Sequence, residues 1–144
     1  MINILTGISN TAAALTAERT RMEVTSQNIA NANTTRGLDG KPYQRQHVVF
    51  QAHLDSLSAG LAGADTSLSA MDVARVEKDH RPPRLVRMPG HPDADANGMV
   101  AVPDINIHEE WADYISASRA FEANLAVVKN ARAMAMQTLS IGKA

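Results

Sequence analysis

An acidic turn in this sequence has the spacing of oxygen-bearing side chains that opens a calcium-binding loop. The residues in that order are Asp93, Asp95, Asn97 and Gly98. In a twelve-residue loop that begins at Asp93, Asp104 occupies the final ligand position. Prolines at 89, 92 and 103 break the helices that should flank such a loop. We therefore expect a polar turn whose aspartates bond their own backbone, with a calcium-binding module as the alternative.

The sequence matches the known catalytic and zinc-binding motifs only in part. His108 and Glu109 open the zinc-protease pattern, but the second histidine would have to stand at Ala112. The remaining four histidines show no i, i+4 pairing, and the absence of Cys removes thiol nucleophiles and Cys-based zinc sites. We expect no enzyme activity, no catalytic residue, no metal and no cofactor.

Charge and hydropathy exclude two further classes of protein. The 144 residues include 14 Lys and Arg against 15 Asp and Glu, whereas a nucleic-acid binder would usually be more basic. No apolar run approaches the roughly 18 residues that span a bilayer. The first 17 residues carry no charge, but they lack the basic start and continuous apolar run of a secretory signal. We predict no nucleic-acid partner, no membrane insertion and, if the chain is exported, no cleaved signal peptide.

The N-terminal segment has the periodicity of a helix with a narrow apolar seam. Between Ile4 and about Asn33, apolar residues recur at a strict seven-residue spacing, with Leu5 in the adjoining position: Ile8, Leu15, Met22 and Ile29. Most other side chains there are small or uncharged, so this helix requires neighbours on more than one side. An asparagine-rich run that includes Asn28 and Asn31 marks its end.

A second long helix is predicted from Ile107 to about Ile141, a stretch without Pro or Gly. Its larger side chains alternate at spacings of four and three residues, as in a coiled coil. They include Trp111, Tyr114, Phe121, Leu125, Val128 and Leu139. The two apolar seams can be buried against each other, and the remaining uncharged faces against neighbouring copies.

The middle segment holds all six prolines and most of the glycines. Four stretches in it have the composition of short strands: Tyr43–Gln51, Ala70–Glu77, Leu85–Met88 and Met99–Val102. Residues 56–70 are rich in Ser, Ala and Gly, which predicts a flexible loop.

The predicted fold class is mainly α with a small β-rich middle, in which long N- and C-terminal helices pair as a coiled coil. Helices of some 45 and 50 Å at the two ends of so short a chain imply an elongated subunit. The expected organisation is an N-terminal helix within 1–36, a β-rich middle domain at 37–104 and a C-terminal helix within 105–144.

Several motifs closely resemble those of bacterial flagellar axial proteins. Ser26–Thr35, SQNIANANTT, resembles the segment that closes their N-terminal helix, with Gln27 as a mild departure. Ser116–Asn124, SASRAFEAN, resembles their C-terminal helix motif, which usually has Tyr where Phe121 stands. Two middle stretches resemble the short rod proteins of this family: Arg45–Gln51, RQHVVFQ, and Pro89–Val102, PGHPDADANGMVAV.

The resemblance implies a structural subunit of the flagellar basal-body proximal rod, which polymerises through its terminal helices into a hollow, torque-transmitting drive shaft. It implies export by the flagellar type III apparatus and assembly in the periplasm. The implied partners are other copies, other rod proteins and, indirectly, the inner-membrane ring and the export-gate base. Another flagellar axial or rod-type component is the alternative within the family.

From the seams and the resemblance together, we expect thirteen residues to form the assembly interface. They are Leu5, Ile8, Leu15, Met22, Asn28, Ile29, Asn31, Trp111, Tyr114, Phe121, Leu125, Val128 and Leu139.

Overall fold

The computed structural model describes residues 4–53 and 70–141, with side chains described for 7–51 and 75–141. The predicted flexible loop, residues 56–70, lies outside the described residues except for Ala70, which begins a strand.

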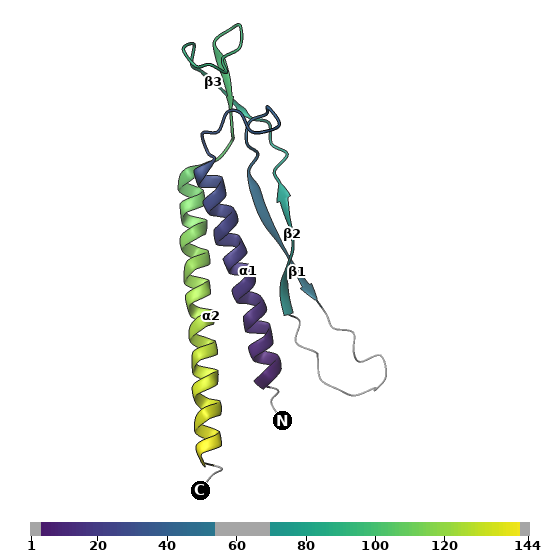
Figure 1. The fold of residues 1–144 in the computed structure, drawn as a ribbon, viewed down its shortest axis with the longest axis vertical. Coiled ribbons are helices and arrows are strands. Elements are labelled where there is room, and N and C mark those ends of the chain that lie inside the picture. Colours follow the sequence, from purple (N-terminus) through teal and green to yellow (C-terminus); the bar gives the residue numbers. More distant parts are fainter. Residues whose placement is uncertain (1–3, 54–69, 142–144) are drawn as a thin grey trace, which may run out of the picture.

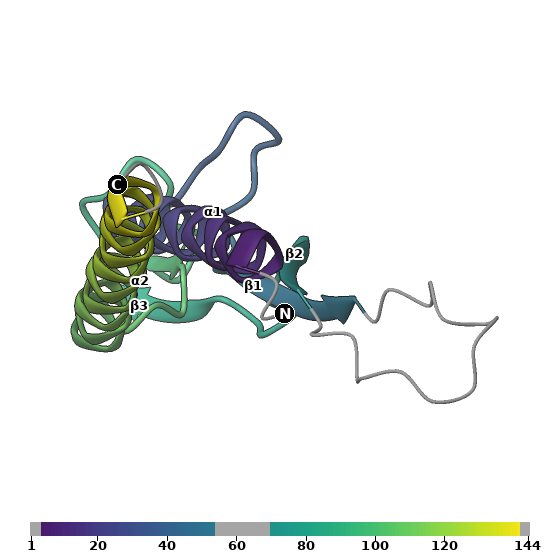
Figure 2. The ribbon, with the colours of Figure 1, turned by 90° about the horizontal axis from the view of Figure 1, so that it is seen from below.

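Two long antiparallel helices form the body of an elongated molecule (Figure 1). Helix α1 spans Ile4–Ala30 and helix α2 spans Ile107–Ile141, which correspond to lengths of about 40 and 52 Å. They lie side by side near the end of α1 and diverge toward the end of the molecule where both chain termini lie (Figures 1 and 2). The prediction of two long, packed helices around a small β-rich middle is confirmed.

The helix boundaries follow from local hydrogen bonds. Helix α1 ends three residues earlier than expected, because a turn begins at Asn31, whose carbonyl accepts a hydrogen bond from the Thr34 N–H at 3.0 Å. Helix α2 begins where predicted. The Asn106 side-chain oxygen accepts from the His108 N–H at 3.1 Å, and the Asn106 amide donates to Glu109 at 3.0 Å.

Two small antiparallel sheets make up the β-rich part. Strands β1 (Gln46–His53) and β2 (Ala70–Lys78) form a hairpin with a bulge between Val49 and Phe50. This hairpin lies along α1 on the side away from α2 (Figure 2). Strands β3 (Arg84–Arg87) and β4 (Met99–Val102) pair beyond the opposite end of the helices from the chain termini (Figure 1). All four predicted strands are present.

The apolar core is thin and consists of small side chains. Those buried are Ala17, Val24, Ala32, Val100, Val102 and Ala117. Small residues allow α1 to approach both of its neighbours closely, but each buries little apolar area, which limits its contribution to stability. With such a core, a large share of the stability of the fold must come from polar contacts.

Candidate assembly surface

Helix α2 exposes two rows of apolar side chains. Ile107, Trp111 and Ile115 follow one another at i, i+4 spacing and are 37%, 50% and 49% exposed. Val127, Met134 and Ile141 form a second row at seven-residue spacing and are 54%, 63% and 72% exposed. The two rows lie on opposite flanks of the stripe that packs on α1. Contiguous exposed apolar surface of this kind is typical of protein–protein interfaces.

The stripe of α2 that packs on α1 has a small residue at its centre. Ala117 is completely buried, and Tyr114, Phe121 and Val128 beside it are half-buried. Tyr114 and Met22 of α1 line the same shallow groove between the helices. The contact therefore uses the Tyr114, Phe121 and Val128 part of the expected seam, together with Ala117, which was not among the predicted interface residues.

The other predicted interface residues of α2 are exposed in the single chain. Trp111, Leu125 and Leu139 are 50%, 37% and 66% exposed. Trp111 and Leu125 point to the side of the buried stripe, whereas Leu139 follows Phe121 by five full turns and shares its face near the end of α2, where the two helices have diverged (Figure 1). Trp111 contacts Tyr114 edge to face, with ring centroids 6.1 Å apart. Trp111 and Leu125 lie on or beside one exposed flank, and Leu139 is exposed near the far end of α2.

The predicted interface residues of α1 occupy a half-buried stripe. Its described members are Ile8, Leu15, Met22 and Ile29. The side chain of Leu5 lies outside the described part. Asn31 is also half-buried, and its amide donates to the Gln27 carbonyl in the last turn of α1 at 2.9 Å.

Asn28 lies inside the subunit, where its side chain uses all four of its hydrogen-bonding positions. Its Nδ2 donates to the Gln46 carbonyl at 2.8 Å and to Glu110 Oε2 at 2.9 Å. Its Oδ1 accepts from the Tyr43 hydroxyl at 3.0 Å and from the Gln46 N–H at 2.9 Å. Asn28 is 1% exposed, so one amide ties the end of α1 to β1 and to the start of α2.

The carboxylate of Glu110 is the second centre of this polar junction. Glu110 is 2% exposed, and Arg45 Nε donates to its Oε1 at 2.6 Å. Asp113 extends the junction, since it lies 3.8 Å from Arg45 and 3.3 Å from Arg21 of α1. A buried carboxylate is stable only when it is both paired and hydrogen-bonded, and both conditions hold here.

Burial, and then the charge of Glu110, raise the pKa of Tyr43 above its ordinary value of 10.0. The Tyr43 hydroxyl therefore stays protonated and remains a hydrogen-bond donor at physiological pH. The sequence pattern predicts a role for Asn28 but gives no indication that Tyr43, Arg45 and Glu110 join it. An ionisable residue on a helix gives no local signal of burial, because that burial depends on segments far away in the sequence.

The carboxylates of the acidic turn do not point toward a common position, because each has a separate partner. Asp95 Oδ1 accepts from the N–H groups of Asn97 and Met99, each at 2.8 Å, which is the expected backbone-capping turn. Asp93 Oδ2 accepts from the Thr35 hydroxyl at 2.8 Å, and Asp104 pairs with an arginine instead. Among the residues that the structure describes, no three His, Asp or Glu side chains are placed to hold a metal ion.

Within residues 4–53 and 70–141, no helix combines the length and hydropathy needed to cross a membrane.

Comparison with known proteins adds an independent observation. A family model described as "Flagella basal body rod protein" matches residues 8–36, and one described as "Flagellar basal body rod FlgEFG protein C-terminal" matches residues 96–141. Three similar curated proteins are each named flagellar basal-body rod protein FlgC. The one from Borreliella burgdorferi is 36% identical over 97% of this chain and 98% of its own length. Those from Yersinia enterocolitica and Bacillus subtilis are 37% and 36% identical, over 91% and 92% of this chain and 92% and 93% of theirs.

Proposed function

This chain belongs to the family of the flagellar basal-body rod protein FlgC, and we propose that it polymerises through its terminal helices into the hollow, torque-transmitting shaft of the proximal rod. Its function is that of a structural subunit of the basal-body rod, which assembles with other rod components. The observation that carries the proposed mode of assembly is the pair of exposed apolar flanks on α2.

Each flank of α2 suits contact with a helix of a different neighbour. Helix α1 already covers the stripe around Ala117, so a flank such as Val127, Met134 and Ile141 is free to pack on a second subunit. The flank of Ile107, Trp111 and Ile115 can then contact a third. Contacts between different surfaces of identical subunits build an open helical assembly when their rotation does not close.

The polar junction prepares the helix pair for this packing. Asn28 and Glu110 fix the end of α1 against the start of α2, so the two helices already share a defined register before a neighbour arrives. Preorganisation of this kind lowers the entropy lost on association. The predicted role of the remaining interface residues, Ile8, Leu15 and Ile29 among them, is to pack against neighbouring rod subunits.

Export without a cleaved signal, through the flagellar type III apparatus into the periplasm, is part of the same proposal. Membership in the family of a basal-body rod protein supports this route. N-terminal sequencing of the chain recovered from purified basal bodies should find the residues of the N-terminal segment intact. Loss of that segment, or periplasmic chain in cells without the export apparatus, would contradict this route.

The assembly surface is tested by adding one charge to an exposed flank. Met134→Asp leaves the α1 contact untouched, but it places a carboxylate that would lose its water in the assembled rod, at a cost of several kcal/mol. We expect cells that carry this variant alone to be non-motile, with no chain in their basal bodies. Gln137→Asp is the matched control on the exposed face between the flanks, and it should assemble. Normal swimming with Met134→Asp would show that this flank is not an interface.

A further inference from the structure

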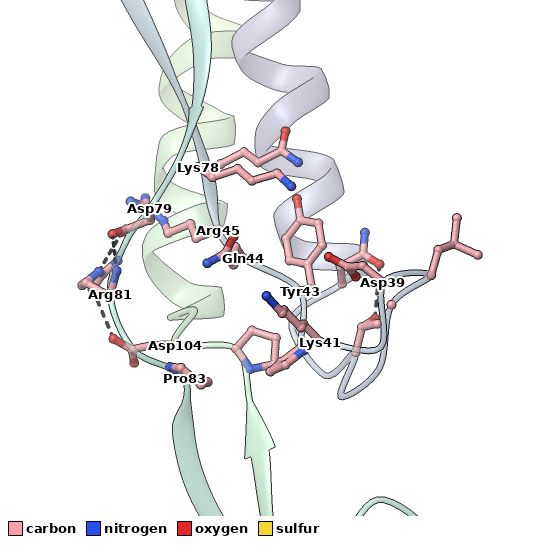
Figure 3. A pocket seen from close by; sticks show the side chains of 17 residues that line it. Asp39, Lys41, Tyr43, Gln44, Arg45, Lys78, Asp79, Arg81, Pro83 and Asp104 are labelled. Carbon is pink, nitrogen blue, oxygen red and sulfur yellow. Dashed lines mark hydrogen bonds and ion pairs between the residues drawn. The ribbon is translucent and has the colours of Figure 1, made fainter.

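A cavity of about 490 Å³ lies where the linker after α1 meets the bases of the two sheets. Its wall combines the Tyr43 ring with Pro42, Pro83 and Pro103, and charged side chains surround it (Figure 3). A hollow of this size, with an apolar wall and a few charged groups, is typical of a binding site. Tyr43 and Arg45 of the polar junction lie in its wall, but neither the junction nor the α2 flanks fill it.

Two of the cations around this cavity have no ion-pair partner in the part of the chain that the structure describes. Arg45 and Arg81 form ion pairs with carboxylates of the same chain. Lys41 and Lys78 form none among the described residues, and both side chains extend into the hollow beside Tyr43 (Figure 3). This lysine cavity therefore presents two ammonium groups, the carboxylate of Asp39 and an apolar wall to whatever occupies it.

The same chain carries a rigid acidic loop that complements this cavity. The acidic tip, residues 91–97 between β3 and β4, holds two aspartates, and residues 88–103 contain no Lys or Arg. Asp95, Ala96 and Asn97 are exposed at its outer edge. Asp95 caps the turn through Oδ1 alone, so its Oδ2 has no partner among the described residues.

We propose that the acidic tip of one copy docks into the lysine cavity of a second copy. The inference rests on the proposed function and adds to the helical flanks a second contact between subunits. Each subunit then offers one tip and one cavity, a head-to-tail arrangement that extends an open assembly. Opposite charges on the two surfaces favour this pairing over tip-to-tip or cavity-to-cavity contacts.

The tip is already in a fixed conformation, which favours docking. The Asp95 N–H donates to the Met99 carbonyl and the Gly98 N–H to the Asp95 carbonyl, at 2.8 and 2.9 Å. Asp93 anchors the loop to the linker, because it accepts from the Thr35 hydroxyl at 2.8 Å and pairs with Arg36 at 3.6 Å. Asp95 therefore carries the carboxylate of the tip that has no ion pair among the described residues. Little conformational entropy remains to be lost when such a loop binds.

The chain has no cysteine, so a disulfide can report this contact directly. Ala96→Cys and Lys78→Cys are placed on two differently tagged copies, co-expressed in cells that lack the native gene. We expect oxidation of purified basal bodies to give a disulfide-linked pair that carries both tags, and neither variant alone to give one. Ala96→Cys with Gln137→Cys is the control pair and should give none.

The proposal would be overturned if both Cys variants were recovered in basal bodies but formed no disulfide-linked pair carrying both tags. An equal yield of disulfide from the control pair would overturn it as well. Failure of the proposed function is distinguishable, because the tagged native chain would then be missing from basal bodies.

A second measurement covers Cys variants that do not assemble. Lys78→Glu should abolish swimming, and Asn97→Lys in the same chain should restore it. Normal swimming with Lys78→Glu, or no rescue by Asn97→Lys, also contradicts the inference.

Discussion

Replacing Asn28 by Ala should be among the most destabilising single substitutions in the chain, even though it removes no large apolar group. The change deletes four hydrogen bonds at once and leaves partners of Asn28 without a replacement in a nearly closed site. An unmatched buried donor or acceptor costs more free energy than a hydrogen bond contributes when formed.

The magnitude follows from the kinds of bond that are lost. Three of the four join neutral groups and contribute about 1 kcal/mol each, while the bond to the Glu110 carboxylate contributes about 2 kcal/mol. A neighbouring cavity of about 290 Å³ admits water to part of the site and offsets some of the loss. We therefore expect a loss of about 4 kcal/mol in the free energy of unfolding, a large fraction of the total for a domain of this size.

Urea denaturation of the purified chain, followed by far-UV circular dichroism, measures this difference directly. Asn31→Ala is the matched control, because its side chain is half-buried and bonds only to near neighbours in the chain, the Gln27 carbonyl and the Thr34 hydroxyl. We expect that control to lose less than about 1 kcal/mol. Thermal unfolding should show a midpoint lowered by roughly 8–16 °C for Asn28→Ala.

Asn28→Asp separates the effect of lost hydrogen bonds on stability from the effect of lost side-chain volume. The shape is unchanged, but an oxygen replaces the Nδ2 group that lies 2.9 Å from Glu110 Oε2, so two carboxylates face each other. We expect at least the same loss as for Ala at pH 7. If either variant lost less than about 1 kcal/mol, the junction would not hold the helices together and the reasoning would be refuted.

Three further predictions concern other polar features. Tyr43→Phe should cost about 1 kcal/mol at pH 7, measured by urea denaturation. Because the folded-state pKa of Tyr43 is raised, the stability that its hydroxyl contributes is complete below pH 10 and falls as the pH rises further, so the deficit of the variant should shrink by pH 10.5. Gly98→Ala should lower stability by about 2 kcal/mol, since φ is +72° and the new Cβ would lie 3.1 Å from the Cβ of Pro89. Millimolar calcium should leave the thermal midpoint unchanged, because the Asp95 carboxylate already caps its turn; a rise of several degrees would restore calcium binding as a hypothesis.

Local periodicity was sufficient to predict the long elements. Helix α2 begins and ends at the predicted residues, because a stretch without Pro or Gly combines strong helix formers with a regular apolar pattern. Strand β4 also matches, since its alternation puts Val100 and Val102 on the buried face. Strand β1 starts at Gln46 rather than Tyr43, because the residues before it bind the junction instead of a partner strand.

The contacts between elements were harder to predict. Sequence reasoning favours large apolar side chains for a helix seam, which placed Trp111 and Leu125 there. The structure instead buries Ala117, because close approach of α1 leaves room only for a small residue. Arg45 and Glu110 are 65 positions apart, and no local pattern distinguishes a buried ion pair from two surface charges.

The off-centre position of the polar junction gives the helix pair the mechanics of a cantilever. The junction clamps α1 and α2 at one end, and the helices diverge toward the other (Figures 1 and 2). A tilt of about 5° at the clamp moves the far end of a 35-residue helix by about 5 Å, so a small strain near Glu110 becomes a large displacement at Ile141. One subunit can thereby adjust its far end to differently placed neighbours with only a small change at the clamp.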